Sequence, residues 1–249
     1  KNAQEHFEAL KAEATAKGGP TVHTQQTLPD WSGRYTRRGG FNPGYENWWW
    51  VRLNQTPTIL SLLTEEYQTR LVQEAYHHAN TNAAQWPSSY CWPEGLMRRW
   101  HFASVQRFHE LMVTPTLVQW LMGTADNFLL HYHVGRDFNY DGNVPRLGED
   151  VPRWYGESIA FWDDDALITW TSNVQGWTTH GSFEHSNQLQ VIEIFTPWDK
   201  EGFKGLHHET IFYDPEALVE PVRQIQWYEH TSDFTQGNPY VYVECNQTI

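Results

Sequence analysis

Two helical patterns of apolar residues occupy the first third of the chain. Across Ala3–Lys17 apolar side chains recur at helical spacing, and Gly18-Gly19-Pro20 ends the pattern. A longer pattern runs from Thr56 to about His78, with Thr56 at the N-cap position and Pro57 in the first turn. These patterns predict two helices before residue 80.

After about residue 107 the chain changes to short β-prone runs separated by turn residues. These runs predict eight or nine strands: Phe108–Val113, Thr116–Met122, Asn127–Val134, Ser158–Trp162, Ala166–Ser172, Gln188–Thr196, His207–Tyr213, Arg223–Glu229 and Tyr240–Glu244. Because their connections contain no helical pattern, we expect an antiparallel meander. Closure into a β-barrel would remove its exposed edges.

No linker, repeat or low-complexity tract divides the chain, so we interpret residues 1–249 as a single domain of the mainly β class. Residues 1–80 are expected to form a helical and loop extension packed on the barrel, and residues 90–245 the barrel itself. The pattern does not indicate whether the helices cover the barrel mouth, and it does not set the oligomeric state.

Composition excludes several classes of protein. The formal net charge of −13 argues against nucleic acid as a partner, because a phosphate-backbone binder needs a basic face. No apolar run reaches the roughly 20 residues of a transmembrane segment. The aromatic share of 15 %, with 14 tryptophans, has two interpretations: a β-rich core, or a cavity for a flat or ring-shaped ligand.

The chain contains two cysteines, Cys91 and Cys245, and neither lies in a metal-binding spacing. A disulfide is the preferred interpretation for an exported protein, and two separate buried thiols are the alternative. The chain begins with Lys1, so we expect that any signal peptide has already been removed.

Several motifs in the strand region resemble those of a large, mostly uncharacterised family of exported bacterial proteins. The resemblance rests on Pro29-Asp30-Trp31-Ser32-Gly33, Cys91-Trp92-Pro93-Glu94-Gly95 with Arg98, Glu110 with Thr114-Pro115, Gly156-Glu157-Ser158-Ile159, Trp162-Asp163-Asp164-Asp165-Ala166-Leu167, Val191-Ile192-Glu193-Ile194-Phe195, Asp214-Pro215 with Pro221, and Tyr242-Val243-Glu244-Cys245. It implies a lipocalin-like β-barrel, a periplasmic or secreted location and pairing of Cys91 with Cys245, but no settled activity. The chain departs from the family at Ala160 and Asp164, where glycine is usual. It also has histidine within Tyr132–Arg136, in place of the more common hydroxyl and acidic pair.

His131 and His133 are the first candidates for chemistry. In a strand they share one face with Leu129. They are candidate catalytic residues because histidine exchanges protons near neutral pH. With a third ligand they would also form a zinc site, and the structural alternative is a pair that caps an aromatic cluster or faces water.

Glu193 is the third candidate catalytic residue. Alternation along Leu189–Phe195 places its carboxylate on an otherwise apolar face, which is unfavourable unless the group is paired or functional. It is either a general acid or base, or one half of a buried ion pair with Arg98 or Arg136. Later strands add His208, Trp227 and Tyr228, and the expected substrate-binding set is Arg98, Arg136, Tyr155, Trp120, Trp170, His208, Tyr228 and Trp227.

Three functions fit these residues. The first is a cofactor-independent lyase or isomerase that acts on a small aromatic or polycyclic substrate in the barrel cavity. His131 or His133 would be the base, Glu193 would orient it, and Arg98 and Tyr155 would hold an oxygen that gains charge. The second is a non-catalytic carrier or sensor of a hydrophobic ligand. The third is carbohydrate binding through Trp48–Trp50. No G-x-S-x-G motif supports a serine hydrolase. No G-x-G-x-x-G motif or P-loop indicates a nucleotide cofactor, so no cofactor is expected apart from the zinc alternative above.

Overall fold

The computed structural model describes residues 2–38, 60–81, 95–97, 108–123, 128–138, 152–176, 184–200 and 202–231. Two helices are described from end to end, α1 (Ala3–Ala16) and α3 (Glu65–Thr81). The strands are β1 (Gly33–Arg38), β2 (Phe108–Val113), β3 (Leu117–Gly123), β4 (Phe128–Val134), β5 (Glu157–Asp163), β6 (Ala166–Ser172), β7 (Gln190–Lys200), β8 (Phe203–Tyr213) and β9 (Val222–Thr231).

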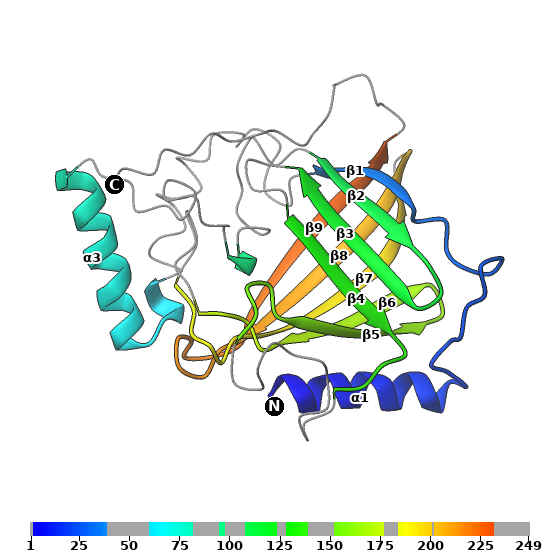
Figure 1. Ribbon diagram of the computed structural model, residues 1–249, viewed down its shortest axis with the longest axis horizontal. Helices are drawn as coiled ribbons and strands as arrows, with labels where there is room; N and C mark the ends of the chain where they lie inside the picture. Colours follow the sequence, from blue (N-terminus) through cyan, green and yellow to red (C-terminus); the bar gives the residue numbers. More distant parts are fainter. Residues whose placement is uncertain are drawn as a thin grey trace.

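These nine strands form one closed barrel in chain order, so the expected mainly β barrel is confirmed (Figure 1). The meander is antiparallel except between β4 and β5, which pair in parallel from Tyr132 opposite Ser158 to Val134 opposite Ala160. Strand direction cannot alternate all the way round a ring with an odd number of strands. One parallel pair is therefore required, and the long connection between β4 and β5 supplies it.

The first barrel strand comes from the part of the chain that we expected to lie outside the barrel. β1 pairs with β2 on one side and with β9 on the other, and so closes the ring. Gly33, which opens β1, has a φ of 143°, and a Cβ there would come within 2.4 Å of the His230 ring. The boundary between extension and barrel at residues 80–90 was therefore wrong. The strand expected at Tyr240–Glu244 lies outside the described residues.

The other expected strands correspond to β2 through β9, with ends that differ by up to four residues. Alternate residues of these strands point into the barrel, where they form the larger hydrophobic cluster. Its largest fully buried side chains on the barrel strands are Trp120, Trp162, Tyr35, Tyr132, Tyr228, Phe195 and Phe212.

The expected first helix is confirmed as α1, which covers the outside of the barrel wall along the lower edge of Figure 1. It begins with a capping box, in which the Asn2 side chain accepts from the Glu5 N–H and the Glu5 carboxylate accepts from the Asn2 N–H. Phe7 inserts between Phe161 and Trp170, with ring centroids 5.2 and 5.6 Å away. The second cluster thus consists of one helix face and the outer face of β5–β8.

The second expected helix is interrupted. The chain is helical at residues 60–62, then pairs by a single bridge between Leu63 and Leu218, and α3 starts only at Glu65. The Thr64 N–H donates to the Ala217 carbonyl and its hydroxyl to the Glu216 carbonyl, so tertiary contacts replace one turn of the predicted helix. In the part of the chain that the structure describes, no helix is long and apolar enough to cross a membrane.

Candidate functional site

The two candidate histidines of β4 point away from the barrel interior. Leu130 and Tyr132 are buried in the interior cluster, and the alternate residues lie on the outer face: Leu129 is 40 % exposed, His131 is exposed and His133 is half-buried. The expected common face of Leu129, His131 and His133 is confirmed. It is the outer face, however, so neither histidine can act from inside the barrel.

Glu193 points inward, as its apolar strand face predicted, and its described partners are not arginines. The His208 imidazole Nε2 lies 2.8 Å from Glu193 Oε1, and the Tyr132 hydroxyl donates to Glu193 Oε2 at 2.9 Å. The Thr210 hydroxyl lies 3.1 Å from the same His208 nitrogen. Glu193 is 1 % exposed and His208 is 0 % exposed. Glu193 and His208 thus form a buried carboxylate–imidazole pair.

Aromatic rings enclose this pair. The Phe195 ring stacks on the His208 imidazole at 4.2 Å between centroids. Trp120 packs against both Phe195 and Tyr228, with ring centroids 5.3 and 4.9 Å away. Its indole N–H donates a hydrogen bond to His109 Nδ1. Trp120, Tyr132 and Tyr228 have no exposed surface. The described centre of the barrel is therefore packed around the pair.

Two other expected ligand-binding aromatics face outward. Trp170 lies under α1 in the outer cluster, and its indole N–H donates to Gln190. Trp227 is half-buried on the outer face of β9, beside His207 at 5.5 Å between ring centroids. Both expectations of a place inside the barrel were wrong, because alternation along a strand does not indicate which of its two faces turns inward. Arg98, Trp48–Trp50, Cys91 and Cys245 lie outside the described residues.

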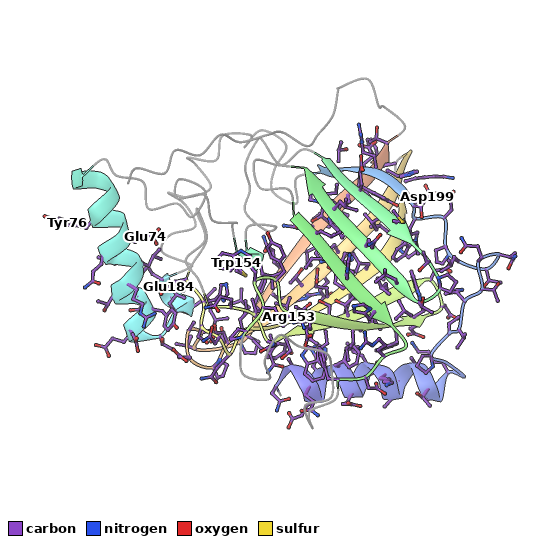
Figure 2. All side chains as sticks on the ribbon, viewed as in Figure 1. Glu74, Tyr76, Arg153, Trp154, Glu184 and Asp199 are labelled. Carbon is purple, nitrogen blue, oxygen red and sulfur yellow. The ribbon has the colours of Figure 1, made fainter. Side chains whose placement is uncertain are left out.

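Four of the expected site residues, His131, His133, Arg136 and Tyr155, meet in a pocket at the place where β4 and β5 diverge. Its volume is about 310 Å³, and its walls are Leu129, Leu130, His131, His133, Arg136, Asp137, Phe138, Arg153, Trp154, Tyr155, Gly156, Glu157, Ser158 and Ile159. We call it the β4–β5 pocket. Arg153 and Trp154, labelled in Figure 2, mark its position beside the start of β5.

The parallel pairing of β4 and β5 explains why a pocket forms here. The two strands are paired only from Tyr132 and Ser158 onward, so the chain before Ser158 and the first half of β4 are free to diverge. At Gly156 the backbone has a φ of 69°, and a Cβ there would lie 2.6 Å from the Ser172 carbonyl oxygen. Glycine is therefore required at the turn that leads into β5.

Charges around the β4–β5 pocket are mostly paired. Arg153 lies 3.2 Å from Glu157, and Asp137 lies 2.7 Å from Lys11 of α1. Arg136 has no ion-pair partner within the described ranges. Burial, followed by the nearby positive charge of Arg136 and by His131, lowers the pKa of His133 below its usual value of 6.5 despite the opposing effect of Glu157. His133 is consequently a neutral imidazole at pH 7.

Sequence reasoning missed several residues around the Glu193–His208 pair and in the β4–β5 pocket. It did not single out Tyr132 as a partner of Glu193, or Phe138 and Trp154 as pocket walls. Trp154 is adjacent to the expected Tyr155, but only the pairing of β4 with β5 brings both beside His133. Among the residues that the structure describes, no three metal-binding side chains lie together.

The chain was compared with known proteins, and no family model, curated protein or solved structure matches it. The resemblance to the exported bacterial family and the expected location therefore remain predictions.

Proposed function

We propose that the protein is a cofactor-independent lyase or isomerase whose active site is the β4–β5 pocket and whose general base is His133. The observation that supports this most is the position of a neutral imidazole, His133, in an aromatic-walled pocket beside the cation Arg136. A general base must be unprotonated at the working pH and must reach the substrate. This site replaces the barrel cavity of our expectation.

The proposed chemistry needs no redox partner. His133 takes the proton of a substrate hydroxyl, the oxygen's electron pair forms a carbonyl, and the adjacent C–C bond breaks. The departing carbon, which keeps the bonding pair, receives the proton from the His133 imidazolium, so the enzyme is regenerated. In an isomerase the same imidazole removes a proton from one carbon and returns it to another. The Tyr155 hydroxyl, another wall group of the pocket, stabilises negative charge on the oxygen during these steps.

Substitution of the histidines tests the proposal. We expect His133→Gln to lower kcat on a panel of aromatic β-hydroxy ketones by about 100-fold or more, because a positioned base contributes roughly 10²–10⁴-fold. Substrate affinity should change little. Product formation is followed by mass spectrometry, and His131→Gln is measured alongside.

The matched control is His207→Gln, since His207 is another half-buried histidine of the outer face but lies outside the pocket walls. Its kcat should equal that of the wild-type protein. Unchanged turnover in His133→Gln would remove the assignment. Binding of panel compounds to the wild-type protein without conversion would favour the carrier function instead.

A further inference from the structure

We infer that the β4–β5 pocket selects aromatic carboxylates of one or two rings, with Arg136 as the carboxylate anchor. The inference rests on the proposed function in taking the same pocket as the substrate site, and it adds the substrate's chemical class.

The distribution of charge in the pocket supports an anionic ligand. Each of the two wall carboxylates already has a cation: Glu157 has Arg153, and Asp137 has Lys11. Once these pairs are counted, no carboxylate among the described residues forms an ion pair with Arg136. An arginine guanidinium presents parallel N–H donors that match the two oxygens of a carboxylate. A neutral or cationic ligand would leave this group unused.

The walls and the size of the pocket support an aromatic body. Phe138, Trp154 and Tyr155 supply ring surfaces. Two of them are held from behind: the Phe138 ring packs edge-on against Trp170 at 4.9 Å, and Tyr155 packs against the interior cluster. A volume of about 310 Å³ lies at the small end of ligand pockets, which run from about 300 to 1,000 Å³, and it accommodates a single or fused double ring.

The negative net charge of the whole protein bears on where a carboxylate preference can arise. With a net charge of −13 the chain as a whole repels anions, so any preference for a carboxylate has to arise locally. Removal of a positive charge elsewhere on the surface should then leave the preference intact, whereas removal of the Arg136 charge should abolish it.

Calorimetric titration with 2-naphthoate and its neutral analogue 2-naphthamide tests this directly. We expect the wild-type protein to bind the carboxylate at least about fivefold more tightly, since an exposed charge-assisted contact contributes about 1 kcal/mol or more. Arg136→Gln should bind the two probes equally. Lys204→Gln is the matched control, because Lys204 is an exposed cation of β8 that lies outside the pocket walls. It should keep the wild-type preference.

Equal affinities in the wild-type protein, a preference that survives Arg136→Gln, or no binding of either probe would each overturn the inference. The same titration with His133→Gln separates it from the proposed function. If that variant keeps the carboxylate preference and the wild-type protein converts no substrate, the proposed activity fails and the ligand class stands. If the wild-type protein turns over neutral aromatics through His133 without any carboxylate preference, the ligand class fails alone.

Discussion

Glu193 and His208 illustrate how a single buried residue depends on its neighbours. The pair lies among the rings of Trp120 and Phe195, where an ionised group without partners is very unfavourable. The Tyr132 hydroxyl supplies a further donor to Glu193. Loss of one partner would leave the other buried and uncompensated, so removal of a single group from this cluster should destabilise the fold.

Tyr132→Phe should lower the free energy of unfolding by about 1–3 kcal/mol, because it removes a donor from a buried carboxyl oxygen without changing the ring. Urea denaturation followed by tryptophan fluorescence measures the effect. Tyr228→Phe provides the comparison, since the Tyr228 hydroxyl donates at 2.6 Å to the neutral amide of Gln226. Tyr228→Phe should lower the free energy of unfolding by less than Tyr132→Phe does. Equal losses in the two variants would contradict a special role for the carboxylate.

The sequence placed Glu193 correctly because alternation of apolar residues along one strand is a local property. It did not indicate Tyr132 and His208 as partners, because Tyr132, on β4, is 61 positions away in the sequence and His208 comes from the neighbouring strand β8. His208 was singled out for substrate binding, whereas its imidazole contacts Glu193. Partners of this kind depend on how strands are aligned across the barrel, which alternation along one strand cannot reveal.

At the scale of elements, the apolar side of the amphipathic helix α1 packs against an apolar part of the outer barrel wall. The buried side of the helix carries Ala3, Phe7 and Ala14, and the barrel wall opposite carries Phe161 and Trp170. Helices of this length are marginal in isolation, so packing of the apolar face supplies most of their stability. The wall in turn needs the helix, because it would otherwise expose contiguous apolar surface.

Phe7→Ala should destabilise the protein by about 3 kcal/mol or more, as expected for removal of a buried aromatic side chain. Chemical denaturation measures the change in unfolding free energy. Glu8→Ala, at the next and exposed position of α1, should stay within about 0.5 kcal/mol of the wild-type protein. A Phe7→Ala variant as stable as the Glu8→Ala variant would show that α1 is only loosely attached to the barrel.

At the scale of the whole molecule, buried histidines make stability depend on pH. His185 is 2 % exposed, and burial lowers its pKa below the ordinary value of 6.5. The unfolded chain therefore takes up a proton at a higher pH than the folded protein does. The contribution of His185 to the free energy of unfolding is fully present above about pH 6.5. It is lost as the pH falls toward the lowered pKa of His185 in the folded protein. The pKa of His133 is lowered in the same direction.

The free energy of unfolding should therefore fall between pH 7 and pH 5 in the wild-type protein, and it should fall less in His185→Gln, which cannot take up this proton. Urea denaturation at several pH values gives both slopes. The exposed His230 offers a control, because His230→Gln should keep the wild-type slope. Identical slopes in all three proteins would show that His185 does not contribute.

The amino-acid sequence alone determined the class of the protein, the helix α1, the strands β2–β9 and the two histidines that share a face of β4. These features follow from periodicity over a few residues, which the chain carries locally. Tertiary structure decided that β1 closes the ring and that β4 and β5 run in parallel. It also decided that His131 and His133 face outward to the pocket while Glu193 turns inward to His208. Each of these depends on register and on which strand face is covered, because both are set by contacts between segments far apart in the chain.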